Sequence, residues 1–310
     1  MAIPRLTPAD VTIVGFKVID LRFPTSLAGV GSDAMHVGTN GSQPYIQLLT
    51  NQPGLIGEGI VSSCHSPKRK INPEQDFLSK GAHSNRRTRN QAFSNGRGSE
   101  LICACLEIFA KRVVGKTMHE LTRNMGKTWR YMVSDSQYRW VGPEKSITHL
   151  ATAGVLNGIW DLWGKILSKP VWQIVCDMTP EEIVRCIDFR YITDVITPEE
   201  ATKMLEKAQE GKEERFKEAW ENIAVPAYST SPGWMALSAD KMREVLDQEI
   251  KEGYTVFKFK VGSDLEADRA KLAAIRDVLG YDKGYQIMID ANQVSWGLFF
   301  SQNKEGRRTN

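Results

Sequence analysis

The sequence predicts an α/β protein in which a first region of strands and helices is followed by regularly alternating strands and helices. Strand-like runs at Val11 to Leu21, Tyr45 to Leu49 and Leu55 to Val61 precede the first helical pattern. From Ala224 onward, strand and helix patterns alternate, which is typical of parallel βαβ units in a sheet or a barrel. With 310 residues, the chain has room for two domains with separate cores.

The first region has clear local signals. The turn Asn51-Gln-Pro-Gly54 separates two strands and predicts an antiparallel hairpin. Ser99 is a suitable N-cap for a helix that extends to about Val114. The segment from Glu144 to Leu167 is the most apolar helix, so we expect it at the centre of this domain.

The second region begins with a helix start at Thr197-Pro-Glu-Glu200. These residues combine an N-cap, a first-turn proline and a capping-box glutamate, and they predict a charged surface helix to about Lys217. The other expected elements are strands at Val225 to Thr230, Val256 to Val261 and Gln286 to Asp290, and helices at 238–252 and 264–279.

Residues 63–95 interrupt the first region. Lysine and arginine outnumber acidic residues there, and apolar periodicity is weak, so we expect a disordered insert. A nucleic-acid or targeting patch at 68–89 is a less favoured interpretation, because the basic residues lack interleaved aromatic residues.

Composition argues against several partners and compartments. A net charge of +3, with 41% hydrophobic and 25% charged residues, favours neither nucleic acid nor a membrane as a partner. No apolar run reaches the roughly 18 residues of a membrane span, and the N-terminus lacks a secretory pattern. The five cysteines are odd in number and scattered, so we expect a cytoplasmic or mitochondrial location.

Two polar triplets, Lys258-Phe-Lys260 and Asp290-Ala-Asn292, end successive expected strands. Residues two apart in a strand face the same side, and the carboxyl ends of parallel strands meet at one edge. Because like charges repel and burial disfavours charge, we expect one lysine to act as a base near neutral pH. Asp290 is an oxygen ligand suited to Mg²⁺, which could stabilise an enediolate. A solvated strand face is the alternative interpretation of the lysine pair.

The run Phe257-Lys-Phe-Lys-Val-Gly262, followed by Met288-Ile-Asp-Ala-Asn-Gln293, resembles the mandelate racemase-like branch of the enolase superfamily. Within that branch, the chain is similar to the L-fuconate dehydratases, including the mitochondrial enolase superfamily member 1 proteins. Further matches are Gly31-Ser-Asp-Ala-Met-His36, Asn157-Gly-Ile-Trp-Asp-Leu-Trp163 and Ile187-Asp-Phe-Arg-Tyr-Ile-Thr-Asp194.

The resemblance implies an α+β capping domain followed by an incomplete (β/α)₇β, TIM-like barrel. It places the capping domain at 1–180, with the insert at 63–95, and the first part of the barrel at 181–296. Residues 297–310 match nothing expected of the family and are interpreted as a foreign tail. The family continues beyond this point with further metal ligands and an Asp/His pair, so we expect a truncated chain.

The resemblance also implies a function, that of an acid-sugar dehydratase, a hydro-lyase that forms a 2-keto-3-deoxy acid with the help of Mg²⁺. The partner is a small sugar acid, and the full-length family allows a homo-oligomer. The implied roles are Lys260 as the base, Lys258 as the carboxylate-binding residue, Asp290 as a Mg²⁺ ligand, and Asn292, Ser32 and Asp33 as substrate contacts. The alternative is an inactive chain, either truncated or the product of a faulty gene model.

Overall fold

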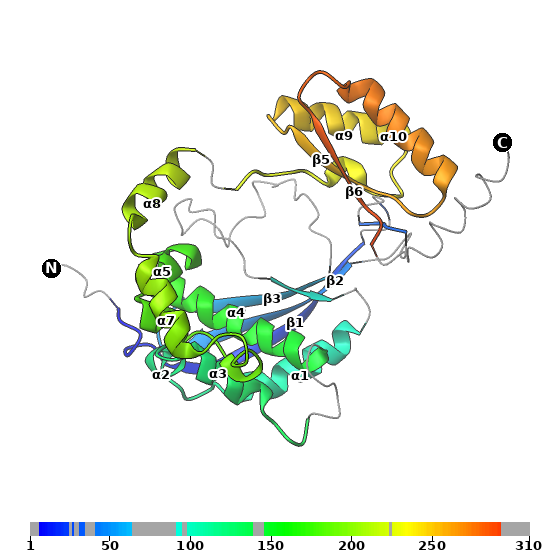
Figure 1. Cartoon of the computed structure of the whole chain (residues 1–310). Coiled ribbons are helices and arrows are strands. Elements are labelled where there is room, and N and C mark those ends of the chain that lie inside the picture. The colour runs from blue at the N-terminus through cyan, green and yellow to red at the C-terminus, as the bar shows by residue number, and fades with distance from the viewer. Residues whose placement is uncertain are drawn as a thin grey trace. The chain divides into compact units, whose positions relative to one another are not determined.

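The computed structural model describes residues 6–24, 27, 31–34, 41–63, 91–94, 98–138, 146–222 and 225–292 (Figure 1). These residues form two compact units. The first contains the described residues of 6–22, 42–63 and 91–218, and the second contains those of 23–41 and 219–292.

The first unit contains a sheet of four strands in the order β1-β2-β3-β4. The strands are β1 (Ile13–Phe23), β2 (Gly41–Thr50), β3 (Ile56–Ser63) and β4 (Gln91–Ser94). β2 and β3 are antiparallel, which confirms the hairpin predicted around Asn51 to Gly54.

β4 differs from the expected disorder of residues 63–95. Residues 91–94 pair in parallel with the end of β3, from Ile60 to Ser63. An edge strand has unpaired backbone N–H and C=O groups, and a short segment can form hydrogen bonds with them through its own backbone. Because this pairing does not depend on side chains, composition alone did not predict it. Residues 64–90 lie outside the described part of the chain.

The helices of the first unit are α1 (Ser99–Lys111), α2 (Met118–Thr122), α3 (Met125–Val133), α4 (Ile147–Leu167), α5 (Val171–Asp177), α6 (Pro180–Val184), the 3₁₀ helix η2 (Phe189–Tyr191), α7 (Pro198–Lys207) and α8 (Lys212–Glu221), whose last turn belongs to the second unit. Among them, α4 packs against the strand β3 and against the helices α1, α2, α3 and α5, which agrees with a central place for the most apolar helix (Figure 1).

Glycines bring α4 unusually close to β3. A Cβ atom on Gly59 would lie 2.0 Å from the carbonyl oxygen of Gly154, and one on Gly57 would lie 2.4 Å from that of Gly158. Real atoms do not approach so closely. Helix and strand therefore meet backbone to backbone, and no larger residue fits at the two strand positions.

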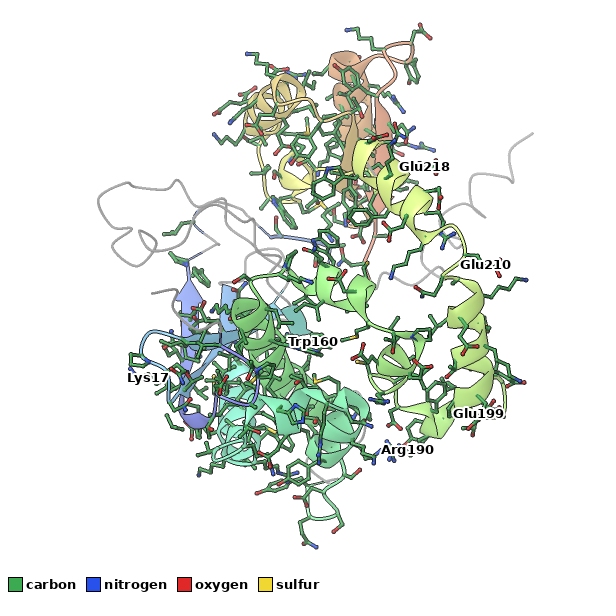
Figure 2. The ribbon with its side chains drawn as sticks, turned by 90° about the vertical axis from the view of Figure 1, so that its left-hand side faces the viewer. Lys17, Trp160, Arg190, Glu199, Glu210 and Glu218 are labelled. Atoms are coloured by element: carbon green, nitrogen blue, oxygen red, sulfur yellow. The ribbon has the colours of Figure 1, made fainter. Side chains whose placement is uncertain are left out.

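The charged helix expected from 197 to 217 is two helices in the structure. The capping box at Thr197 and Glu200 starts α7 as predicted. The backbone of Gly211 then adopts a left-handed conformation, with φ of +64°, which ends the first helical run and separates it from α8. Figure 2 labels Glu199 on α7 and Glu218 on α8, and both side chains are exposed, as expected for a surface element.

The boundary between the compact units falls at 218/219, and the domain boundary expected at 180/181 stays a prediction. Contacts with α3 hold the intervening segment to the first unit. The N–H of Gly126 donates to the carbonyl of Arg185 at 2.8 Å, and Arg130 forms an ion pair with Asp188. Sequence patterns do not reveal such contacts between distant segments.

The second unit is a βαβ arrangement. Its elements are η3 (Ser231–Gly233), α9 (Ala239–Lys251), β5 (Val256–Lys260), α10 (Leu265–Leu279) and β6 (Gln286–Asp290). β5 and β6 are parallel, and Lys260 lies opposite Asp290 in the register. The buried core consists of Met242, Leu246, Phe257, Phe259, Ile275 and Leu279.

The strand expected at 225–230 is reduced to a single bridge. Ser229 pairs in parallel with Phe257, and its N–H donates to Val256 at 2.9 Å while its carbonyl accepts from Lys258 at 2.8 Å.

The described helices and cysteines bear on two further expectations. None of these helices is both long enough and apolar enough to cross a membrane. On α1, burial raises the pKa of Cys103 and of Cys105 to about 11, so both side chains are protonated thiols at neutral pH, as is consistent with free cysteines in a reducing compartment.

Candidate active site

Lys260 is the centre of the candidate site. It is the last residue of β5, and its side chain is buried. Its ammonium donates to Oδ2 of Asp290 and to Oδ1 of Asn292, each at 2.9 Å. The sequence places these three side chains together because the carboxyl ends of two neighbouring parallel strands meet at one edge.

Asp290 and Asn292 form a small turn, which holds Oδ2 of Asp290 and Oδ1 of Asn292 toward Lys260. The N–H of Asn292 donates to Oδ1 of Asp290 at 2.9 Å. Asn292 has φ of +54°, a left-handed conformation that asparagine tolerates better than most residues. The residue type is thus suited both to the backbone and to the contact with Lys260.

Lys258 lies two residues earlier on β5 and contacts a tyrosine. Its ammonium donates to the hydroxyl of Tyr228 at 3.1 Å and lies 4.9 Å from the centre of that ring. The same ammonium is 3.5 Å from Oδ2 of Asp290. Burial by itself lowers the pKa of Lys258, but the contacts with Tyr228 and Asp290 outweigh it and the pKa is raised.

The sequence predicts that one lysine of the pair acts as a base near neutral pH, and for Lys260 this stays a prediction. Lys258 is unsuited to that role because the tyrosine and the aspartate stabilise its charged form. Lys258 remains an ammonium ion at neutral pH, which suits the binding of an anion.

Asp290 is ionised in this arrangement. Burial tends to raise its pKa, but hydrogen bonds from Lys260 and from the N–H of Asn292, together with the charges of Lys260 and Lys258, lower it. Two lysines and one carboxylate leave the cluster with an excess of positive charge. Such a cluster attracts a negatively charged ligand such as a carboxylate.

Trp234 forms a wall of the site beside Lys260. Its ring centre lies 5.9 Å from the Lys260 ammonium, within the range of a cation–π contact, and the side chain is buried. The residues that follow Trp234 hold the segment at 31–34. The N–H of Ala236 donates to Oγ of Ser32 at 2.7 Å, and the N–H of Met235 donates to the Ser32 carbonyl at 3.2 Å.

The structure therefore connects Ser32 to the site through the segment that contains Trp234. Asp33 follows Ser32 and is also buried. Closure of these two residues over a substrate stays a prediction. His36, the last residue of the quoted motif, lies outside the described residues.

Two residues of the site, Tyr228 and Trp234, were not predicted from the sequence. Alternation in the expected strand at Val225 to Thr230 offers a signal for Tyr228, because the bridged neighbour Ser229 faces the Phe257 side and leaves Tyr228 on the lysine side. Trp234 follows a turn, where no periodicity applies, and sequence reasoning had no signal for it.

The described residues do not by themselves fit a bound Mg²⁺ ion. Asp290 is the one carboxylate of the cluster, and both its oxygens already accept hydrogen bonds, from Lys260 and from the Asn292 N–H. No group of three or more His, Cys, Asp and Glu residues in the described part of the chain is placed to hold a metal. Octahedral Mg²⁺ requires more oxygen ligands than this.

The fold and the strand-end cluster resemble those of enolase-type proteins, and comparison with known proteins finds the same likeness. Residues 241–302 match the family described as enolase C-terminal domain-like. The chain is similar to proteins of the enolase superfamily, in the branch of mandelate racemase and muconate lactonizing enzyme.

Curated relatives share much of the sequence. The L-galactonate dehydratase of Hypocrea jecorina is 47% identical over 290 residues, which cover 94% of this chain and 57% of that protein. Human mitochondrial enolase superfamily member 1 is 40% identical over 278 residues, which cover 89% of this chain and 55% of that protein. The chain thus spans a little over half the length of these relatives.

Solved structures share the fold. The crystal structure of human mitochondrial enolase superfamily member 1 matches with a TM-score of 0.76 and 37% identity, covering 94% of this chain and 60% of that one. The structure of L-talarate/galactarate dehydratase from Salmonella typhimurium LT2, liganded with Mg and L-lyxarohydroxamate, matches with a TM-score of 0.52 and 16% identity. It covers 94% of this chain and 55% of that one, and it is a likeness of fold alone.

Proposed function

We propose that the protein is an acid-sugar dehydratase that converts a six-carbon aldonic acid into a 2-keto-3-deoxy acid. The observation that supports this best is the cluster of Lys260, Lys258 and Asp290 at the ends of β5 and β6. The relative named L-galactonate dehydratase supports L-galactonate as a substrate. L-Fuconate, the acid suggested by the sequence resemblance, differs from it only by the missing hydroxyl at C6.

In this proposal, Lys258 binds the substrate carboxylate with its ammonium. Lys260 removes the proton at C2, a double bond forms between C2 and C3, and the C3–O bond breaks. The departing hydroxide takes a proton and leaves as water, and the resulting enol becomes the 2-keto acid. Lys260 can act in this way only after it has lost the proton that it donates to Asp290 and Asn292.

The remaining roles belong to the same proposal. β5 and β6 would be successive strands of a (β/α)₇β barrel, with the first unit as its capping domain. Ser32, Asp33 and Asn292 would contact the sugar acid. Asp290 is the residue of the cluster that would hold Mg²⁺ together with ligands from outside the described residues, since a carboxylate supplies the oxygen atoms that this ion prefers.

The test is an assay of the purified 310-residue protein with L-galactonate and with L-fuconate in the presence of Mg²⁺. We expect a 2-keto acid, measured as its semicarbazone, and deuterium at C3 of the product formed in D₂O. The Lys260→Ala variant should lose at least about 100-fold in rate, because general base catalysis contributes that much or more. The Lys258→Met variant should raise KM, because it removes the cation that binds the carboxylate.

The control is Lys241→Ala. Lys241 lies exposed on α9 and pairs with Glu244 at 2.7 Å, so its loss should leave the rate unchanged. If the parent protein forms neither 2-keto acid nor deuterated product, the proposal is wrong for this chain, and the competing prediction of an inactive chain is supported.

A further inference from the structure

Lys271 is a partly buried lysine that the proposed chemistry does not use. It lies on α10, and its ammonium donates to the carbonyl oxygens of Gly233 at 3.3 Å, Trp234 at 3.4 Å and Lys260 at 3.3 Å. An ammonium group has three N–H donors and no acceptor, so three carbonyl oxygens use its full capacity. Burial lowers the pKa of Lys271, and the charge of Asp268 opposes that shift.

The three carbonyls belong to two segments that meet at the site. Lys260 ends β5, whereas Gly233 and Trp234 lie at the end of η3. The η3 segment rests directly on the strand, because a Cβ atom on Gly233 would lie 2.0 Å from the carbonyl oxygen of Lys258. Lys271 therefore lies where the backbone of the strand and the backbone beside Trp234 come together.

We propose that Lys271 is a positioning residue, whose ammonium fixes the end of β5 to segment 233–236 and so sets the place of Lys260 relative to Trp234 and Ser32. The proposal deepens the proposed function, on which it rests for the role of Lys260 as the base. Lys271 itself touches only backbone oxygens of the site. It acts through the residues to which it donates.

A second contact from the same helix makes the role of Lys271 separable from the folding of the βα unit. The carboxylate of Asp268, one turn earlier on α10, accepts from the N–H of Gly262 at 2.7 Å. Asp268 is buried and holds α10 to the chain just after β5. Without Lys271, we expect α10 and β5 to stay together while segment 233–236 loses its hydrogen bonds to α10 and shifts relative to β5.

The experiment follows Trp234 by ¹⁹F NMR in the full chain labelled with 5-fluorotryptophan. The chain has eight tryptophans, and a Trp234→Phe variant identifies the resonance. In Lys271→Ala, we expect that resonance to move to the position of an exposed fluorotryptophan. In Arg269→Ala, it should not move, because Arg269 is an exposed cation of the same helix that pairs with Glu266.

Chemical rescue separates a specific contact from a general loss of stability. Propylammonium can replace the missing ammonium in Lys271→Ala and should restore the Trp234 resonance, whereas tetramethylammonium has no N–H to donate and should not. The proposal is overturned if the resonance stays in place in Lys271→Ala, or if the two cations act equally on the variant. Neither readout depends on dehydratase activity, so an inactive parent protein would refute the proposed function without deciding the role of Lys271.

Discussion

At the scale of single residues, ion pairs join segments that are distant in the sequence, both in the first unit and in the second. Asp188 precedes η2 and forms an ion pair with Arg130 of α3. Burial by itself raises the pKa of Asp188, but hydrogen bonds from Arg130 and from the N–H of Arg190 outweigh it and lower the pKa below the usual value of 3.8. The ionised form therefore stabilises the folded first unit.

The sign of the pH dependence follows from that direction. A carboxyl group with a lowered pKa contributes its stability above the usual pKa and loses it as pH falls through the folded value. We expect the free energy of unfolding of the first unit to fall as the pH drops below the usual pKa of 3.8, and to fall less in Asp188→Asn. At pH 7, that variant should cost about 1 kcal/mol or less, as for other partly exposed pairs.

Urea unfolding at a series of pH values, followed by circular dichroism, measures this difference. Asp194→Asn is the control, since Asp194 is an exposed aspartate in the same segment. Equal pH slopes for the parent protein and Asp188→Asn would show that the pair with Arg130 contributes nothing.

Part of the candidate site could be predicted from the sequence at this scale. Alternation along a strand is a local rule, so the pairs Lys258 and Lys260, and Asp290 and Asn292, could be assigned to one edge of the sheet. The charge state of Lys258 could not be predicted, because it depends on Tyr228, which lies thirty residues away in the sequence. Contacts across such distances leave no periodic signal.

At the scale of elements, the contact between α4 and β3 is the most demanding in the first unit. Gly59 of β3 meets the backbone of α4 with no space for a side chain. We expect Gly59→Ala to lower the free energy of unfolding by about 3 kcal/mol, because the added methyl group forces helix and strand apart.

The control for this prediction is Gly15→Ala on β1. A Cβ atom there would meet the nearest side-chain atom, on Leu49, at an ordinary 3.8 Å. Its stability should be close to that of the parent protein in the same urea titration. A similar loss in both variants would mean that the close approach of α4 is not the cause.

A second feature at the scale of elements is the edge of β6 that faces away from β5. Among the described strands, β6 pairs only with β5, and Ile289 is 61% exposed. An exposed apolar edge strand promotes pairing between chains, and a charge on it prevents such pairing. We expect Ile289→Lys to reduce self-association, measured by sedimentation velocity at several protein concentrations.

Val225→Lys is the matched control for the edge of β6. Val225 is 80% exposed but lies outside the strands, so the same added charge should have little effect there. If both variants reduce self-association equally, net charge and not the edge strand is responsible.

Sequence patterns predicted most elements but not their interruptions. Amphipathic periodicity and the capping box at Thr197 placed the start of α7. The break at Gly211 was missed because glycine inside a charged helical pattern is compatible with a continuous helix. The strand expected at 225–230 is a single bridge at Ser229, because the extent of pairing depends on a partner strand distant in the sequence.

At the scale of the whole molecule, the two units have separate buried cores. We expect them to unfold in separate steps, each sensitive to its own core. Leu246 is fully buried in the second core. Leu246→Ala should lower the free energy of unfolding of the second unit alone, by about 2–5 kcal/mol. Gly59→Ala should lower the free energy of unfolding of the first unit alone.

Differential scanning calorimetry combined with hydrogen exchange assigns each step to its unit. In the double variant, the two losses should add, because the cores share no residue. One cooperative transition that shifts equally in both single variants would contradict this prediction.

The attachment of Ser32 to Ala236 also affects how the chain is made. The two residues are 204 positions apart, yet the segment at 31–34 belongs to the second unit and lies in the sequence between two strands of the first. At a synthesis rate of roughly 5–20 residues per second, Ala236 is synthesised about 10–40 s after Ser32. During that interval, a chaperone or a nascent neighbour has access to a segment that the finished protein buries.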